Sequence, residues 1–308
     1  RLYVMAPRPG RIHKEYNLPF ALMGLKEDLR EIKNLKDFAS KREEILTKLE
    51  QEWERHLSNI SPIVREEPIV KFSVQDALAD LFMQESKLSS LLSTLERKKN
   101  IVIQGPPGVG KTFASRLIAY AHIGKRDDNR VNMIQFHQSY SYEDFVQGWR
   151  PNAAGGFELR DGVFMKFCKK AKQAPSEKYV FIVDEINRGN LSRVFGELMM
   201  LIEADKRSTK YALPLTYSDD SFYVPENVYL IGLMNTADRS LALVDYALRR
   251  RFSFFELEPS FSSESFKQHL QNLGVPIDLI NLIESSLTAL NNEIQNDQHL
   301  GKGFRIGH

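Results

Sequence analysis

The segment GPPGVGKT, residues 105–112, limits the possible folds of this chain more than any other feature. It fits the pattern G-x-x-x-x-G-K-[ST] and lies between a β-branched run at 101–104 and an amphipathic helix expected over 111–124. In such a loop, successive backbone N–H groups point at phosphate oxygens, and the positive end of the following helix adds to the attraction. A chance glycine-rich turn is the alternative, but the strand–loop–helix context favours a nucleotide-binding α/β domain.

We expect this loop to bind a nucleoside triphosphate together with Mg²⁺. Lys111 is placed to reach the β- and γ-phosphates, and the hydroxyl of Thr112 is placed to ligate the metal. The predicted nucleotide-binding residues of this segment are Gly105, Pro106, Gly108, Val109, Gly110, Lys111, Thr112 and Phe113.

A second apolar run, KYVFIVDE at 178–185, ends in two carboxylates. We expect Asp184 to hold the magnesium ion through its water shell, and Glu185 to orient or deprotonate the attacking water. Asn187 and Arg188 follow in a turn, where the amide could position water and the guanidinium could reach a phosphate or a neighbouring subunit. Turn-forming and surface roles are the alternatives for these two residues. One helix is expected next, with an apolar face formed by Leu191, Val194, Phe195, Leu198 and Met199.

Further strand candidates predict a parallel sheet covered by helices on both faces. These candidates are residues 101–104, 132–136, 178–185, 227–234 and 251–257. Ligands of such sheets bind beyond the carboxyl ends of the strands, which is where Asn235 falls. Its amide could bond the γ-phosphate or the attacking water without a charge that competes with magnesium, although a simple strand-end turn is the alternative. Asp238 and Arg239 follow closely, near the nucleotide or a neighbouring subunit.

Three consecutive arginines, Arg249, Arg250 and Arg251, end a helix predicted directly before the strand at 251–257. Three adjacent residues cannot share one face of a helix, so at least one should project away from its own nucleotide. Such an arginine could enter the site of a neighbouring subunit and stabilise charge in the transition state of phosphoryl transfer. A solvated basic helix end that complements the helix dipole is the alternative.

The chain has 308 residues, a net charge of +2 and one cysteine. We divide it into an N-terminal arm with an amphipathic helix at 1–72, a large α/β nucleotide-binding subdomain at 73–259, and the beginning of an incomplete helical lid at 260–308. The near-zero charge gives no reason to expect nucleic-acid binding from bulk electrostatics. Cys168 is read as buried packing, which fits a reducing, cytoplasmic location, and no run is long enough for a membrane helix.

Five blocks together resemble the McrB family, the AAA+ motor subunits of McrBC-type modification-dependent restriction systems. They are GPPGVGKTF, QFHQSYSYEDFVQG, VDEINRGNLSRVFGELMMLIE, IGLMNTADRSLALVDYALRRRFSF and GKGFRIGH, and the resemblance runs from about residue 73 to residue 308. It implies a GTPase that forms a nucleotide-dependent ring, by resemblance a hexamer, and that works with a McrC-like nuclease subunit and, through that complex, with DNA.

Carried over by position, Lys111 and Thr112 match the Walker A pair, Asp184 and Glu185 match Walker B, and Asn235 matches sensor 1. The segment from Asn235 to Asp238 matches the NTAD motif, which the family links to guanine nucleotides, and Arg250 and Arg251 match the region expected to act in trans. Arg305 is a weaker match to a sensor 2 arginine. Residues 1–70 do not resemble a methylated-DNA-binding domain, so recognition of modified bases is not carried over.

Two other interpretations stay open at this point. A MoxR-like AAA+ ATPase that remodels protein complexes would share the DEINR turn and the arginines. A monomeric nucleotide-binding switch would share the phosphate loop but would have no residue acting in trans. Preference for GTP rests on the resemblance alone, because the chain has no N-K-x-D guanine motif of the switch-GTPase type.

Overall fold

The computed structural model describes residues 2–6, 11–16, 70–153, 155–238 and 246–308, and the chain divides into two compact units, 1–67 and 68–308. In the first unit, β1 (Leu2–Ala6) pairs with β2 (Arg11–Tyr16) in antiparallel fashion. We had expected an irregular arm, because Pro7, Pro9 and Pro19 interrupt this stretch. In the sequence, however, Pro7 and Pro9 fall between the two strands and Pro19 follows β2. The amphipathic helix expected at 41–57 lies outside the described residues.

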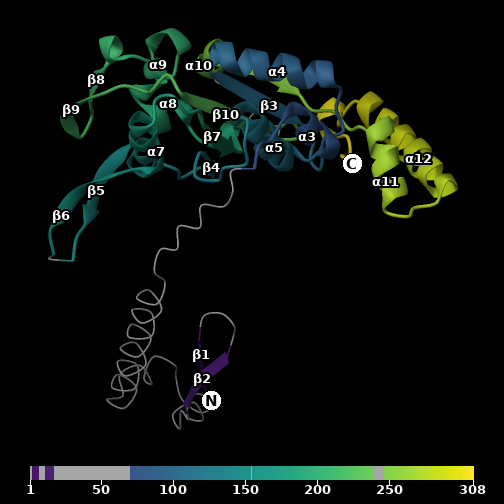
Figure 1. The fold of residues 1–308 in the computed structure, drawn as a ribbon, viewed down its shortest axis with the longest axis horizontal. Coiled ribbons are helices and arrows are strands. Elements are labelled where there is room, and N and C mark those ends of the chain that lie inside the picture. Colours follow the sequence, from purple (N-terminus) through teal and green to yellow (C-terminus); the bar gives the residue numbers. More distant parts are fainter. Residues whose placement is uncertain (1, 7–10, 17–69, 154, 239–245) are drawn as a thin grey trace. The chain divides into compact units, whose positions relative to one another are not determined.

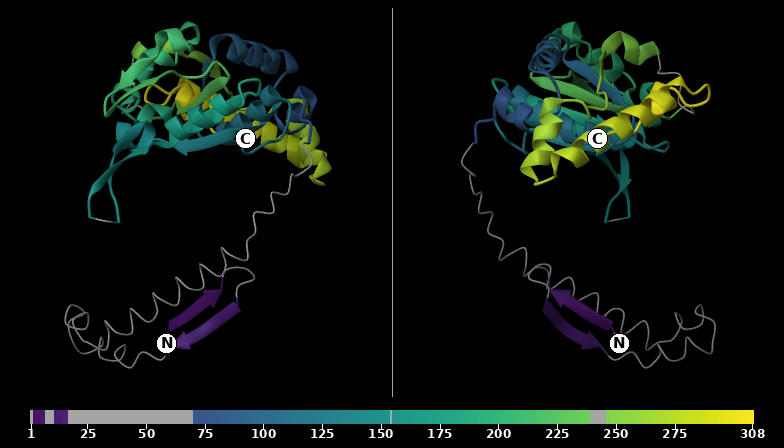
Figure 2. Two further views of the ribbon diagram at one scale, coloured as in Figure 1. Left: turned by 60° about the vertical axis from the view of Figure 1, so that its left-hand side comes forward. Right: turned by 90° about the vertical axis from the view of Figure 1, so that its right-hand side faces the viewer.

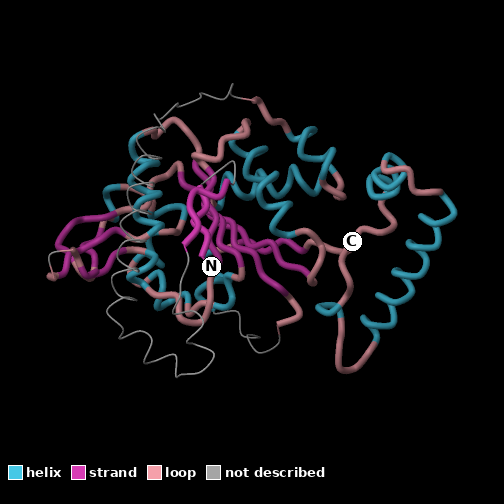
Figure 3. The backbone as a smooth tube through the Cα atoms, turned by 90° about the horizontal axis from the view of Figure 1, so that it is seen from below, coloured by secondary structure: helices cyan, strands magenta, loops and turns pink. Residues whose placement is uncertain are grey.

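The second unit is built around a five-stranded parallel sheet with the order β11-β3-β10-β7-β4 (Figures 1 and 3). All five predicted strands are present within one or two residues of their expected bounds. They are β3 (Asn100–Gly105), β4 (Val131–Gln135), β7 (Tyr179–Asp184), β10 (Val228–Asn235) and β11 (Ser253–Glu256).

Two hydrophobic clusters cover the two faces of this sheet, because alternate side chains of each strand point to opposite faces. On β3, Ile101 and Ile103 belong to one cluster and Val102 to the other. The first cluster also contains residues of α3 (Val74–Asp80), α4 (Glu85–Lys98) and α5 (Lys111–Ile123). The second contains residues of α6 (Tyr142–Phe145), α7 (Val163–Gln173), α8 (Leu191–Phe195) and α9 (Leu198–Leu201). The prediction of a sheet buried on both faces is confirmed.

The chain after β7 does not form the single helix that we expected. A 3₁₀ turn, η2 (Ile186–Arg188), is followed by α8, and the helix stops at Gly196 before α9 begins. Gly196 has a φ of 51°, and a β-carbon there would lie 2.9 Å from the ring of Tyr142. The apolar face was nevertheless assigned correctly, since all five of its residues are buried.

Two small hairpins and three short helical segments complete the α/β part. β5 (Gln147–Pro151) and β6 (Phe157–Asp161) form a hairpin that projects from the body of this unit (Figure 2). β8 (Leu213–Leu215) and β9 (Ser218–Phe222) form another. The remaining segments are η3 (Ala204–Lys206), η4 (Thr209–Tyr211) and α10 (Tyr246–Arg251).

The last residues are helical, as predicted. α11 (Glu264–Asn272) packs beside α12 (Ile277–Asn296), with Lys267 Nζ 3.0 Å from Glu284 Oε2, and η6 (Lys302–Phe304) follows near the C-terminus. In the described part of the chain, no helix combines the length and the apolar character needed to cross a bilayer.

Candidate nucleotide-binding site

The loop between β3 and α5 has the backbone geometry of a phosphate cradle. Gly108 and Gly110 have φ values of 82° and 72°, which residues other than glycine rarely adopt, and Gly110 is the N-cap of α5. The amino group of Lys111 donates to the carbonyl oxygens of Gly105 and Pro106 at 2.9 and 2.8 Å. Burial lowers the pKa of Lys111, and the nearby Glu185 and Asp184 carboxylates oppose that shift. A phosphate oxygen would give this amine a charged partner in place of two loop carbonyls.

Thr112 and Asp184 meet at the carboxyl edge of the sheet, as the two motifs predicted. The Thr112 hydroxyl donates to Asp184 Oδ2 at 3.2 Å, and Asp184 Oδ1 accepts from the backbone N–H of Glu185 at 2.9 Å. A hydroxyl and a carboxylate are the hard oxygen donors that Mg²⁺ prefers. Among the described residues, no group of three or more His, Cys, Asp and Glu side chains could hold a metal.

Glu185 is held by Arg188, which also contacts Asp238. Arg188 Nε donates to Glu185 Oε2 at 3.2 Å, and Arg188 Nη2 donates to Asp238 Oδ2 at 3.0 Å. The two carboxylates raise the pKa of the exposed guanidinium. The structure therefore joins the acidic strand end and the NTAD segment through one arginine.

Asn235 ends β10, and Asn187 lies in the turn η2 between Glu185 and Arg188. Asn235 is paired in register with Gly105 at the start of the phosphate loop, and its amide oxygen accepts from the N–H of Ala237 at 3.1 Å. The amide oxygen of Asn187 is buried and has no hydrogen-bond partner among the described residues. A buried unsatisfied acceptor beside Glu185 marks a position where a water molecule would be stabilised.

The three consecutive arginines differ in exposure and in their contacts. Arg249 and Arg250 are exposed, whereas Arg251 Nη2 lies 2.9 Å from Glu203 Oε1 of the same chain. Arg239 lies outside the described residues. Arg250 is therefore better placed than Arg251 to reach another subunit.

The C-terminal segment 301–308 lies against the phosphate loop, which the sequence interpretation did not anticipate. The N–H of Gly307 donates to the carbonyl oxygen of Pro107 at 3.2 Å, and Gly303 lies against Thr236. Arg305 does not point at the loop, because its guanidinium lies 3.4 Å from Glu256 and 3.5 Å from Glu258. Its geometry therefore gives no support to a sensor 2 role.

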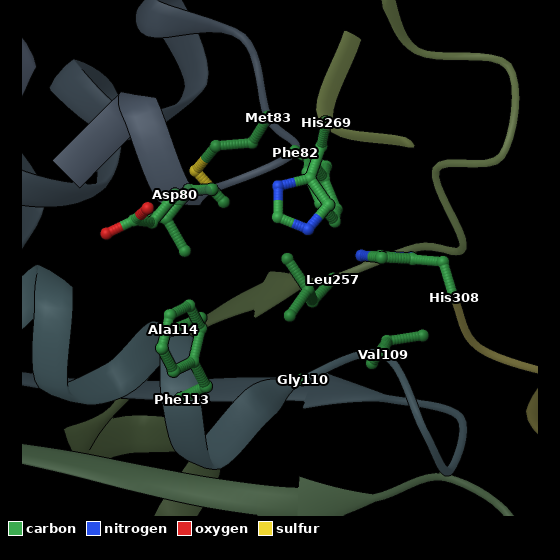
Figure 4. A pocket seen from close by; sticks show the side chains of 11 residues that line it. Asp80, Phe82, Met83, Val109, Gly110, Phe113, Ala114, Leu257, His269 and His308 are labelled. Atoms are coloured by element: carbon green, nitrogen blue, oxygen red, sulfur yellow. The ribbon is translucent and has the colours of Figure 1, made fainter. Parts of the chain in front are cut away.

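A pocket of about 330 Å³ adjoins the phosphate loop (Figure 4). Its walls come from the end of α3 and the following loop, from α5, from the end of β11, and from α11 and the C-terminus. Phe113 and Asp80 lie on one side, and Val109 and His308 lie on the other. The lining residues are Asp80, Leu81, Phe82, Met83, Val109, Gly110, Phe113, Ala114, Leu257, His269 and His308. Apart from Phe113 and its loop neighbours, these residues were missed because no local motif marks them.

Comparison with known proteins shows which proteins the chain is similar to. Residues 100–252 match the model of the AAA domain (dynein-related subfamily). The chain is 52% identical over 275 residues to the Type IV methyl-directed restriction enzyme EcoKMcrB subunit of Escherichia coli (strain K12), which covers 88% of this chain and 59% of that protein.

Two further relatives are more distant or more local. The Type II restriction enzyme BsuMI component YdiS of Bacillus subtilis (strain 168) is 27% identical over 233 residues, covering 57% of this chain and 66% of that protein. The Taurine import ATP-binding protein TauB of Pelagibacter ubique (strain HTCC1062) is 79% identical over only 47 residues, 15% of this chain and 18% of that protein.

The parallel sheet, the phosphate loop and the paired strand-end acids define a P-loop nucleoside triphosphatase of the AAA+ class. Within that class, the chain is similar to the McrB subunit of Escherichia coli, with which it shares 52% identity over 88% of its length. The chain spans 59% of the length of that relative.

Proposed function

We propose that this chain hydrolyses GTP with Mg²⁺ as a motor subunit of a modification-dependent restriction complex. The observation that carries the proposal is the convergence of Lys111, Thr112, Asp184 and Glu185 at one edge of the sheet. Phosphoryl transfer needs positioning and neutralisation of charge, and these four side chains offer a cation, two metal ligands and a base. The resemblance of the chain to a restriction subunit supports the biological setting.

Each side chain has a distinct role in this proposal. Lys111 binds the β- and γ-phosphates, Thr112 and Asp184 hold the magnesium ion, and Glu185 accepts a proton from the attacking water. The bound metal ion would supply charge neutralisation between the phosphates. Asn235 and Asn187 fix the position of that water by hydrogen bonds. Arg188 holds Glu185 in place through the contact at 3.2 Å.

The pocket beside the loop is our proposed site for the base. Its mostly apolar lining and the exposed ring of Phe113 suit a stacked purine. Asp80 at its rim is an acceptor, and guanine offers two donors on one edge, N1–H and the 2-amino group. Adenine has an acceptor at N1 and no 2-amino group, so a carboxylate there disfavours ATP.

Assembly completes the proposed site. A ring of copies would bring Arg250 and Arg249 to the phosphates of a neighbour, where an arginine stabilises the charge that develops in the transition state. A McrC-like nuclease would be the partner that couples hydrolysis to DNA, because a relative that matches 88% of this chain is a subunit of a methyl-directed restriction enzyme. We expect such a complex to work in the cytoplasm.

A competition assay tests the choice of nucleotide. We expect GTP to displace a fluorescent guanine nucleotide at least tenfold better than ATP, and Asp80→Asn to reduce that ratio toward one, since one donor–acceptor mismatch is worth about 1–3 kcal/mol. Glu85→Gln, a nearby acid that does not line the pocket, is the control. Equal displacement by ATP and GTP in the unaltered chain would overturn the guanine part of the proposal.

Stimulation by a partner separates the two motor hypotheses. We expect a McrC-like nuclease subunit to accelerate hydrolysis. Stimulation by a protein substrate, with none by such a nuclease, would instead favour a MoxR-like remodelling ATPase.

A further inference from the structure

Arg207 is a fully buried cation whose hydrogen-bond partners, among the described residues, are uncharged oxygens. Its exposed fraction is 1%, and it donates to the carbonyl oxygens of Ile202, at 3.0 Å, and Val228, and to Asn100 Oδ1. Burial lowers the pKa of this guanidinium to about 10. Leaving any of its donors unpaired would be costly in this environment, so the guanidinium fixes the relative positions of the oxygens around it.

Asn100 links this buried cation to helix α10. Its side-chain N–H₂ group donates to Ile202 O at 2.8 Å and to Arg251 O, at the end of α10, at 3.1 Å. A second contact holds the same residue, since the guanidinium of Arg251 lies 2.9 Å from Glu203. The side chain of Arg251 is thus held directly by Glu203, and its backbone is held through Asn100, which also bonds Ile202.

The anchored helix also carries the two exposed arginines. Arg249 and Arg250 directly precede Arg251, so the orientation of α10 decides where their guanidinium groups point. A displacement of about 1 Å in a group that acts on a reacting phosphate can lower a rate by about 100-fold. An anchor at the end of α10 is therefore a means of controlling catalysis in a neighbouring copy.

We propose that Asn100, Glu203, Arg207 and Arg251 form an α10 anchor that positions Arg249 and Arg250 for the site of the next subunit. In this arrangement Arg251 is a positioning residue of its own chain and is not the group that enters the neighbour. The inference rests on the proposed trans role of the arginines, and it adds the residues that make that role possible.

Mixed assemblies provide the test, with GTP hydrolysis by the full chain as the readout. Glu203→Gln removes the charge that holds Arg251, and we expect about a tenfold lower kcat with KM changed by less than twofold. Mixing it with a Glu185→Gln chain should restore activity, because the Glu203→Gln copies keep an intact nucleotide site and receive well-placed arginines from their neighbours. Asp205→Asn is the matched control, since Asp205 pairs with Lys206 on the same segment without touching α10.

The outcomes separate this inference from the proposed function. Full activity of Glu203→Gln would overturn the anchor, and so would a loss of activity that mixing does not restore. If Arg250→Ala and Arg249→Ala each keep full activity, the trans role itself fails. Should Glu203→Gln not fold, Glu203→Asp, which withdraws the carboxylate by one methylene, is judged by the same restoration.

Discussion

Glu185 adopts a backbone conformation that is unusual for its residue type. Its φ of 51° lies in the left-handed region, which costs of order 1–3 kcal/mol for a residue with a β-carbon. Two hydrogen bonds offset this cost, because the N–H of Glu185 donates to Asp184 Oδ1 and its carboxylate accepts from Arg188 Nε. The strain and the contacts together fix the carboxylate at the edge of the sheet where we place the attacking water.

Asp238 is the residue through which this arrangement can be tested. Asp238→Asn removes one of the two carboxylates that hold the guanidinium of Arg188, so Arg188 holds the carboxylate of Glu185 less firmly in place. Because an exposed ion pair is worth about 0–1 kcal/mol, we expect kcat to fall about two- to fivefold with little change in KM. The measurement is steady-state hydrolysis from pH 5 to 9.

An exposed acid outside the site, Asp220 on β9, is the control for that change, and Asp220→Asn should leave both constants unaltered. A rise in KM at constant kcat would contradict our assignment. It would place Asp238 on the nucleotide, as the sequence interpretation first suggested.

At the scale of elements, the C-terminal segment 301–308 depends on one close approach to the phosphate loop. A β-carbon on Gly307 would lie 2.1 Å from the carbonyl carbon of Gly108, which leaves no room for a side chain. We therefore expect Gly307→Ala to push the segment off the loop and to weaken nucleotide binding by at least tenfold. Titration with a fluorescent nucleotide measures this affinity.

Gly156 supplies the matched control. A β-carbon there meets only Asn152 atoms at 3.5 Å or more, an ordinary contact distance, so Gly156→Ala should bind nucleotide like the unaltered chain. Unchanged affinity in Gly307→Ala would show that contact of the segment with the loop does not matter for binding.

Some elements are specified by local sequence patterns and could be predicted, whereas others depend on contacts between residues far apart in the chain and could not. The phosphate loop, the strand ending at Asp184 and the strand ending at Asn235 were predicted because apolar runs and motifs specify them locally. The stop at Gly196 depends on the ring of Tyr142, and the pairing of Arg251 with Glu203 depends on residues 48 positions apart. Such long-range contacts leave no periodic signal, so the broken helix, the pocket beside the phosphate loop and the contacts that hold Arg251 came only from the structure.

At the scale of the whole α/β unit, one cluster of titratable side chains connects helices α4 and α5 to strand β10 and to the residue just before β7. His122 of α5 packs edge-on against Tyr229 of β10, with ring centroids 4.2 Å apart, and lies 3.6 Å from Glu96 of α4. Glu96 also accepts from Lys178, just before β7, at 2.6 Å, and from Tyr229 at 2.8 Å. Four segments distant in sequence therefore meet around one buried imidazole.

This cluster predicts how the stability of the fold depends on pH. Burial, with Lys178 adding to it and Glu96 opposing it, lowers the pKa of His122 to about 3, well below its usual value of 6.5. For Glu96, burial is outweighed by the hydrogen bonds from Lys178 and Tyr229, which lower its pKa to about 2. Below pH 6.5 the unfolded chain binds a proton at His122 that the folded chain does not, so stability is lost as the pH falls toward 3. Glu96 contributes in the same direction, but only below about pH 4.5.

Urea unfolding between pH 7.5 and 5.5 excludes the contribution of Glu96, and comparison with a His122 variant separates His122 from other groups such as His308, whose pKa is also lowered by burial. We expect the free energy of unfolding to fall across this range with a slope approaching about 1.4 kcal/mol per pH unit from this one residue. His122→Gln removes the titrating ring, so its stability should depend less on pH by that amount, whatever its absolute stability. His137→Gln, at an exposed histidine, should keep the slope of the unaltered chain. Equal slopes in the unaltered chain and in His122→Gln would mean that folding does not change the proton affinity of His122, which would contradict the lowered pKa.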